Sequence, residues 1–158
     1  QAAKEGASDL PISVKTRIGF NVIEYETWLP DLLKEGISAL TVHLRTKKEM
    51  SDVPAHFELA NDIVRVVREI DKDVVLIANG DIYTLEQGSK FMKDTGFNGV
   101  MIGRGIFGNP WLFDSKRKNP PNIQEKLKAL IEHTRIYEKL LDYINFANMK
   151  KHFKAYVS

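Results

Sequence analysis

Residues that could bind an anion stand at the ends of four short apolar runs in the sequence. They are Lys15 and Arg17, His43 and Arg45, Asn79 and Asp81, and Gly103 and Arg104. The carboxyl ends of parallel strands meet at one edge of a sheet, and ligands of α/β proteins bind at that edge. Cations, amides and glycines there offer hydrogen-bond donors to a negatively charged group. The spacing therefore predicts one anion-binding site built from four strand ends.

The segment 103–108 matches the pattern G-x-G-x-x-G of dinucleotide-binding proteins. That site also needs a strand ending in an acid about 20 residues later. Residues 120–128 carry no strand pattern, so we reject the dinucleotide interpretation. The glycines still allow backbone N–H groups to approach a phosphate, with Arg104 as a forked donor and the positive end of a following helix beside them.

One side of this phosphate site is predicted at residues 103–108, and Asn79, Gly80 and Asp81 are the predicted opposite side. A carboxylate repels a phosphate unless it is engaged elsewhere, so Asp81 is expected to orient the loop. Lys15 and His43 are expected further along the ligand, where fixed donors can stabilise negative charge on a reduced ring system. The residues alone leave the identity of that ring open.

The elements that position these residues are predicted from the apolar pattern. Strands are expected at 12–18, 39–44, 73–78 and 99–102, with helices at 24–35, 55–70 and 84–96 and a short helix after the fourth strand. Gly36 is expected to end the first of these helices, and Pro30 to kink it or delay its start. Near-continuous apolar strands indicate a parallel sheet covered on both faces. Four such βα units fit either a doubly wound sheet or half of an eight-stranded barrel.

The sequence changes character after Pro120 and Pro121. Asn122 and Glu125 form a predicted capping pair, and two helices are expected, the second over 143–156. Residues 1–114 hold 13 basic and 17 acidic side chains, whereas residues 115–158 hold 10 and 4, net charges of −4 and +6. We therefore predict two domains, 1–114 and 115–158, and expect the second to face a polyanion.

The overall composition excludes several classes of protein. The 158 residues are 43% hydrophobic and 28% charged, which is typical of globular proteins, and no apolar run approaches the length of a membrane span. The absence of cysteine excludes a disulfide scaffold, a cysteine-ligated zinc site and a cysteine nucleophile. Because the first residue is Gln1 and Ser158 falls within a helical pattern, we expect further protein, or a partner chain, to cover the strand edges.

Four segments resemble tRNA-dihydrouridine synthases in order and spacing over residues 11–114. They are Val14 to Gly19, Thr41 to Thr46, Asn79 to Ile82, and Met101 to Gly105 continuing through Gly108-Asn109-Pro110-Trp111. The string 109–113 is the most specific, because other flavin barrels share only the looser phosphate pattern. The segment 149–153 resembles the family's helical domain less closely.

The resemblance implies the C-terminal half of a TIM (β/α)8 barrel, about four βα units, followed by a partial all-α helical domain that binds tRNA. In that family FMN reduces uridine to 5,6-dihydrouridine in tRNA, usually with NADPH as reductant, in the cytoplasm. Lys15 and His43 would contact the isoalloxazine. The ribityl phosphate would be held by Asn79, Gly80, Asp81, Gly103 and Arg104. Contacts to tRNA would come from Arg45, Lys150, Lys151 and His152.

This sequence departs from the family pattern in two ways. It shows only four of eight strands, and it lacks the cysteine that acts as general acid. Without that acid the reduction would stall, so we expect the chain alone to be inactive. Two alternatives remain: another phosphate-binding barrel, either a dihydroorotate-dehydrogenase-like flavoenzyme or a sugar-phosphate isomerase, and a non-catalytic RNA-binding fragment.

Overall fold

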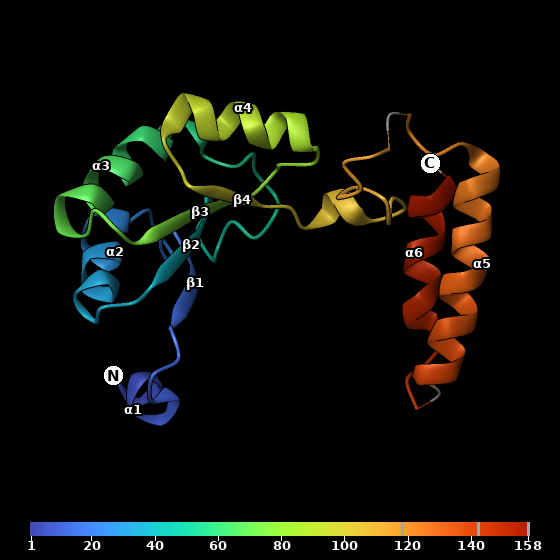
Figure 1. Ribbon diagram of the computed structural model, residues 1–158, viewed down its shortest axis with the longest axis horizontal. Coiled ribbons are helices and arrows are strands. Elements are labelled where there is room, and N and C mark those ends of the chain that lie inside the picture. The colour runs from blue at the N-terminus through green and yellow to red at the C-terminus, as the bar shows by residue number, and fades with distance from the viewer. Residues whose placement is uncertain (118, 142, 158) are drawn as a thin grey trace. The chain divides into compact units, whose positions relative to one another are not determined.

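The four predicted strands form one parallel sheet in the computed structural model, which describes residues 1–117, 119–141 and 143–157 (Figure 1). Strands β1 (Ser13–Arg17), β2 (Ala39–His43), β3 (Val75–Asn79) and β4 (Gly99–Met101) lie in the order in which they follow one another along the chain. Each strand contains at least one β-branched residue, such as Val14, Val42, Val75 and Val100, whose side chain fits a pleated sheet. The predicted α/β class and the parallel pairing are confirmed.

Three helices connect the strands: α2 (Tyr25–Lys34), α3 (Ala60–Ile70) and α4 (Leu85–Thr95). Gly36 ends the turn after α2 with φ of 65°, as predicted. The expected late start at Pro30 is wrong, because α2 begins at Tyr25 and includes the proline. Two further elements were not predicted, helix α1 (Ala2–Ala7) and a 3-10 turn, η1 (Phe57–Leu59), which takes the place of the first turns of the predicted helix 55–70.

The helix α4 starts with a modified version of the predicted cap. The Thr84 hydroxyl accepts the backbone N–H of Gln87, as expected from the sequence. The Gln87 side chain, however, accepts the N–H of Tyr83 rather than that of the cap residue, and it donates to the carbonyl oxygen of Asp81. This shift ties the start of α4 to the loop that follows β3.

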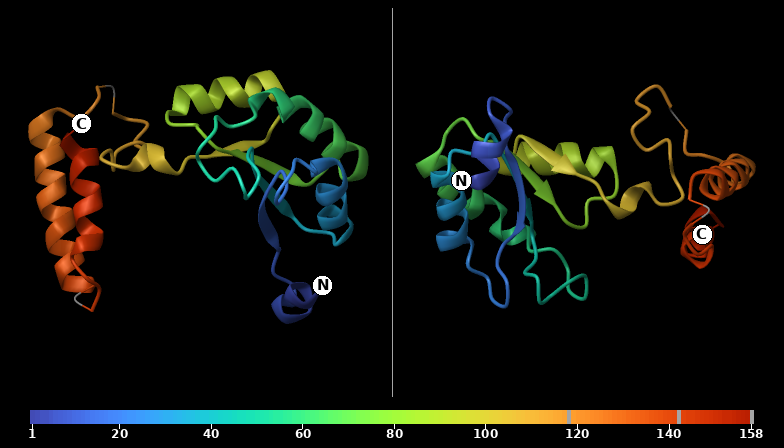
Figure 2. Two further views of the ribbon diagram at one scale, coloured as in Figure 1. Left: turned by 180° about the vertical axis from the view of Figure 1, so that it is seen from behind. Right: turned by 90° about the horizontal axis from the view of Figure 1, so that it is seen from below.

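The core of the sheet lies on one face only. Residues Leu40, Val42, Leu76 and Ala78 are buried on that face, packed with apolar residues of α2 and α3. A Cβ placed on Gly88 of α4 would come within 2.6 Å of Val100, so this helix packs closely on the same face. Figures 1 and 2 show the three helices along one side of the sheet.

The other face of the sheet is open, and the prediction of a sheet covered on both faces is wrong. Alternation along the strands places Lys15, Thr41, Ile77 and Gly99 on this face in one row. Apolar residues there remain in contact with solvent, with Val75 46% and Met101 38% exposed. In β3 both faces carry apolar residues, so this strand has the composition of a buried one, although the chain's own helices cover only one face.

The order of the strands separates the two architectures that the sequence left open. Right-handed crossovers between successive strands place every helix on the same face when the strand order never reverses. A doubly wound sheet reverses its order and has helices on both faces. The order β1-β2-β3-β4 with one covered face is consistent with part of a TIM barrel, in which the open face would line the interior.

The chain divides into two compact units, Gln1–Gly103 (the first unit) and Arg104–Ser158 (the second unit). The second unit contains a 3-10 turn, η2 (Arg104–Ile106), and two helices, α5 (Ile123–Leu140) and α6 (Ala147–Val157), which pack against each other. The assignment of residues 1–114 to half of a flavin barrel and of 115–158 to a tRNA-binding domain stays a prediction. Among the described residues, no helix is both long and apolar enough to span a bilayer.

The first residues of α5 and α6 are determined by their capping residues. Asn122 and Glu125 form the predicted reciprocal capping box at the start of α5. Helix α6 starts four residues later than the predicted 143, because the Asn145 side chain accepts the backbone N–H of Ala147. That bond satisfies an N–H at the helix start and places the boundary there.

Candidate functional site

The carboxyl ends of the four strands form one row of residues across the sheet. Arg17 pairs in register with His43, His43 with Asn79, and Asn79 with Met101. Lys15 lies two residues before Arg17, so both side chains project from the open face. The Asn79 side chain donates to the Met101 carbonyl oxygen at 2.8 Å, which joins the ends of β3 and β4. The first unit therefore brings together Lys15, His43, Asn79, Gly80, Asp81 and, two residues beyond Met101, Gly103.

The cations at this edge line a hollow beside the outer strand β1. Its volume is about 490 Å³, and its lining includes Lys15, Arg17 and Lys47 together with the aromatic rings of Phe20 and Trp28. The ammonium of Lys47 lies 5.1 Å from the centre of the Phe20 ring. The lining also includes the Glu24 carboxylate, so three cations and one anion lie beside two aromatic rings, and the charged side chains give a net positive surface.

His43 is neutral at physiological pH in this environment. Burial, and then the positive charges of Arg17, Lys15 and Arg45, lower its pKa to about 4, with Asp81 acting in the opposite direction. Its Nδ1 is buried and has no hydrogen-bond partner among the described residues. A neutral imidazole keeps one nitrogen as a donor and one as an acceptor. The ring is thus a polar group at the strand ends whose Nδ1 is enclosed by the protein.

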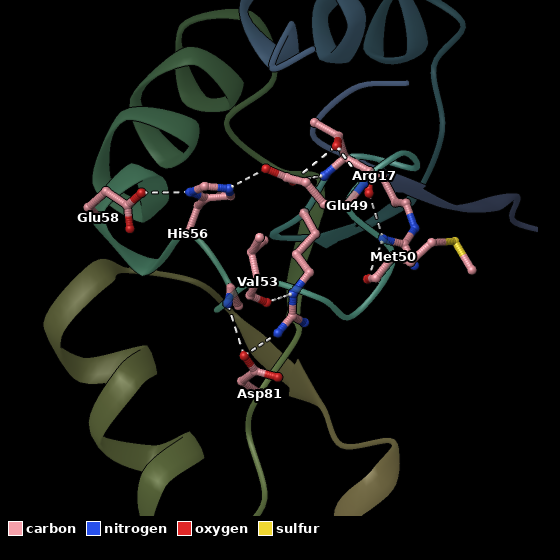
Figure 3. Close-up of polar contacts among 10 residues, drawn as sticks. Arg17, Glu49, Met50, Val53, His56, Glu58 and Asp81 are labelled. Carbon is pink, nitrogen blue, oxygen red and sulfur yellow. Dashed lines mark hydrogen bonds and ion pairs between the residues drawn. The ribbon is translucent and has the colours of Figure 1, made fainter. Parts of the chain in front are cut away.

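Arg45 and Asp81 follow β2 and β3, and both side chains are bonded within the protein. Figure 3 shows the Asp81 carboxylate with its hydrogen bonds. Arg45 is only 2% exposed, and its Nε donates to the Val53 carbonyl oxygen at 2.6 Å. Its Nη2 forms an ion pair with Asp81, whose carboxylate also accepts the backbone N–H of Ala55 at 2.9 Å. The expectation that Asp81 orients the loop agrees with these bonds. The inward-facing Arg45 offers no support for the predicted contact with tRNA.

Sequence reasoning missed a second polar network on the same loop, centred on His56. The two nitrogens of His56 contact Glu49 Oε1 at 2.9 Å and Glu58 Oε1 at 2.8 Å, and the other Glu49 oxygen accepts the N–H and the hydroxyl of Thr46 (Figure 3). The guanidinium of Arg17 donates to the Thr46 and Met50 carbonyl oxygens. A loop has no periodic pattern, so nothing in the sequence marks these pairs.

The stability that this network contributes to the loop depends on pH. Hydrogen bonds to Glu49 and Glu58 raise the pKa of His56. The stability that protonated His56 contributes is therefore fully present below about pH 6.5 and is lost as the pH rises through the raised pKa. Hydrogen bonding to His56 lowers the pKa of Glu49 to about 2, so that contribution is present above about 4.5 and is lost toward pH 2. Both contributions are present together between about pH 4.5 and 6.5.

We therefore expect His56→Gln to lower the urea midpoint most near pH 5.5, and much less near pH 8 or pH 2.5. The measurement is urea unfolding of both proteins at the three pH values. The exposed pair of Lys34 and Asp31 provides the control, because Asp31→Asn removes an ion pair on the surface of α2. An equal effect of His56→Gln at all three values would contradict the assignment.

The second unit holds the remaining predicted residues. Lys150 and Lys151 are exposed on α6, whereas His152 is half-buried, with its ring centre 5.4 Å from those of Phe107 and His133. Arg104 begins η2, which has only three residues. The expected helix end beside the phosphate is therefore wrong, since so short a turn has no appreciable dipole.

The second unit contains a hollow of about 560 Å³ whose lining includes none of the predicted cofactor residues. Its lining includes Phe107, Trp111, His133, His152 and Tyr156. Gly108 packs directly on α6, since an added Cβ would lie 1.9 Å from the Ala155 carbonyl oxygen. The string 109–113 therefore follows a tight contact between a loop and a helix, which is a structural reason for a glycine at that point.

Comparison with known proteins places the chain in a family. The family model of dihydrouridine synthase (Dus) matches residues 2–158. The chain is 43% identical over 143 residues to the "Probable tRNA-dihydrouridine synthase 2" of Bacillus subtilis, covering 90% of this chain and 42% of that protein. It is 39% identical over 160 residues to the "Probable tRNA-dihydrouridine synthase" of Staphylococcus epidermidis, covering 99% and 48%. The chain thus spans about half the length of these relatives. It belongs to the dihydrouridine synthase family.

Proposed function

We propose that this chain forms part of an FMN-dependent tRNA-dihydrouridine synthase that reduces uridine to 5,6-dihydrouridine, with NADPH as the reductant. The observation that carries the proposal is the row of strand ends on the open face. There Lys15 and Arg17 lie beside a neutral, half-buried His43 and the amide of Asn79. The names of the relatives support tRNA as the substrate. A cytoplasmic location is proposed together with that substrate.

The residues at the strand ends fit FMN. Bound there, the flavin would supply a hydride to the uracil ring. Lys15 would stabilise negative charge on the reduced ring, and His43 would offer the nitrogen opposite its enclosed Nδ1. Asn79, Gly80, Asp81, Gly103 and Arg104 would surround the ribityl phosphate. The Asp81 carboxylate is paired with Arg45, so its charge is compensated and it need not repel the phosphate.

The tRNA would be bound through phosphate contacts of the second unit. Lys150 and Lys151 are exposed, and residues 115–158 carry a net charge of +6. Such contacts give affinity and register but no choice of sequence. His152 would contribute through packing more than through charge, because burial and the neighbouring His133 and Lys151 lower its pKa.

The open face of the sheet would be covered by the other half of an eight-stranded barrel. Val75 and Met101 are exposed on this face, and β1 and β4 are the edges of the described sheet. Unpaired strand edges favour further pairing. This chain spans about half the length of its relatives. We propose that the covering strands come from the other half of the family fold, on this polypeptide or on a partner chain.

The 158-residue chain alone is expected to show no dihydrouridine formation. It contains no cysteine, and the family's general acid is a cysteine, so protonation of the uracil ring has no donor. The measurement incubates the purified chain with FMN, NADPH and unmodified tRNA, and counts dihydrouridine by mass spectrometry. Turnover above a protein-free control would overturn this part of the proposal. Salt-sensitive tRNA binding without flavin retention would favour the RNA-binding alternative.

A further inference from the structure

A charged pair lies beneath the predicted flavin site and connects the two loops on either side of it. Arg45 is two residues beyond β2, and Asp81 is two residues beyond β3. The Arg45 side chain is 3% exposed and that of Asp81 21%, so the pair is largely removed from water. A buried ion pair contributes little net stability compared with apolar residues of similar size. A role in fixing the conformation of the two loops is therefore worth testing.

The bonds of this pair lead directly to His43. The Asp81 carboxylate accepts the backbone N–H of Ala55 at 2.9 Å and a hydrogen bond from Nη2 of Arg45. The Nε of Arg45 donates to the Val53 carbonyl oxygen at 2.6 Å. A Cβ placed on Gly80 would lie 3.2 Å from the Ala55 Cβ and 3.7 Å from Cε1 and Nε2 of His43. The backbone of Gly80 is therefore confined between Ala55 and the His43 ring.

We propose that Arg45 and Asp81 are positioning residues, which fix the His43 ring at the flavin site by holding Ala55 and Gly80 against it. The role at a flavin site rests on the proposed function, whereas the contacts that position His43 involve only residues of this chain. It assigns both side chains to the interior, in place of the contacts with tRNA and with the flavin phosphate that the family resemblance implied. Neither side chain would touch the ligand, while the backbone of residues 80 and 81 would still line the phosphate site.

Asp81→Asn separates a positioning role from a purely electrostatic one. The negative charge of Asp81 opposes the lowering of the His43 pKa by Arg17, Lys15 and Arg45, so removing that charge from an otherwise fixed ring would lower the pKa further. If Asp81 positions the ring, the loops separate, water reaches His43, and its pKa rises toward 6.5. The two roles thus predict changes of opposite sign.

The test is an NMR titration of the His43 side chain in the wild-type protein, in Asp81→Asn and in Arg45→Lys. Arg45→Lys keeps the positive charge but loses the planar group that joins Val53 to Asp81. We expect the His43 pKa to rise by at least one unit in both variants, and FMN affinity to fall at least fivefold. Asp62→Asn, which breaks the exposed pair with Arg65, is the matched control and should change neither quantity.

A His43 pKa that stays near 4 or falls in Asp81→Asn, with unchanged FMN affinity, would overturn the proposal. If Asp81→Asn does not fold, Arg45→Lys decides the question by the same two quantities. The His43 titration needs no flavin. Failure of the wild-type protein to bind FMN would therefore count against the proposed function alone, while the titration would still test the positioning role.

Discussion

Lys15→Met is expected to weaken FMN binding about 10- to 100-fold. The Lys15 ammonium projects from the open face in the same hollow as Arg17, and hydrogen bonds to charged groups contribute about 1.5–3 kcal/mol. Methionine keeps a similar length and apolar character, so the loss reports on the charge. Partial burial and the neighbouring Arg17 lower the pKa of Lys15, so FMN binding should also weaken at a lower pH than an ordinary lysine would allow.

The measurement is quenching of FMN fluorescence on titration with protein, at pH 7 and at pH 10. Lys34→Met is the control, because Lys34 is a well-exposed residue of α2 that pairs with Asp31 and is not among the residues lining the hollow. Equal FMN affinity for Lys15→Met and the wild-type protein would exclude Lys15 from the flavin site.

Substitution by alanine should lower the stability of the protein at one glycine of the predicted phosphate site and leave it unchanged at another. Gly80 has φ of 117°, and an added Cβ would lie 3.2 Å from the Ala55 Cβ. Backbone strain of this kind costs about 1–3 kcal/mol, so Gly80→Ala should destabilise the first unit by roughly that amount. Nothing lies within 4 Å of a Cβ on Gly103, so Gly103→Ala should change stability by less than about 0.5 kcal/mol.

The same pair distinguishes a structural glycine from one that a ligand approaches. A methyl group on Gly103 would occupy the space through which a phosphate reaches the backbone, so FMN affinity should fall at least tenfold in a protein of normal stability. Urea unfolding and flavin titration of both variants provide the comparison. Unchanged FMN affinity in Gly103→Ala would remove Gly103 from the phosphate site, and unchanged stability in Gly80→Ala would contradict the close packing against Ala55.

The strands and most helices could be predicted because local patterns determine them. The branched run Val75–Ala78 is extended, and the capping pair Asn122 and Glu125 starts α5 as its residue types require. The sheet's open face could not be predicted. Val75 and Ile77 have the composition of buried strand residues, and a face meant to be covered by another part of a protein looks the same in sequence as one covered by the chain's own helices.

The candidate site was predicted at the level of strand ends but not of side-chain bonds. Register places His43 beside Asn79 because the strands are parallel and in order. The pairing of Arg45 with Asp81, and of His56 with Glu49, depends on how the loop 44–56 folds back, which no periodic pattern encodes. The family resemblance implies a contact of Arg45 with tRNA, whereas the Arg45 side chain is buried in this structure.

Hydrogen–deuterium exchange of the protein, with and without added FMN, tests the proposed flavin site most directly. FMN is predicted to protect peptides that end the four strands, covering 15–19, 43–46, 79–82 and 101–103, and to leave α5 and α6 unchanged. Protection confined to the helices of the second unit, or exchange at the strand ends that is equally fast in both states while FMN is bound, would contradict the assignment of these residues to the flavin.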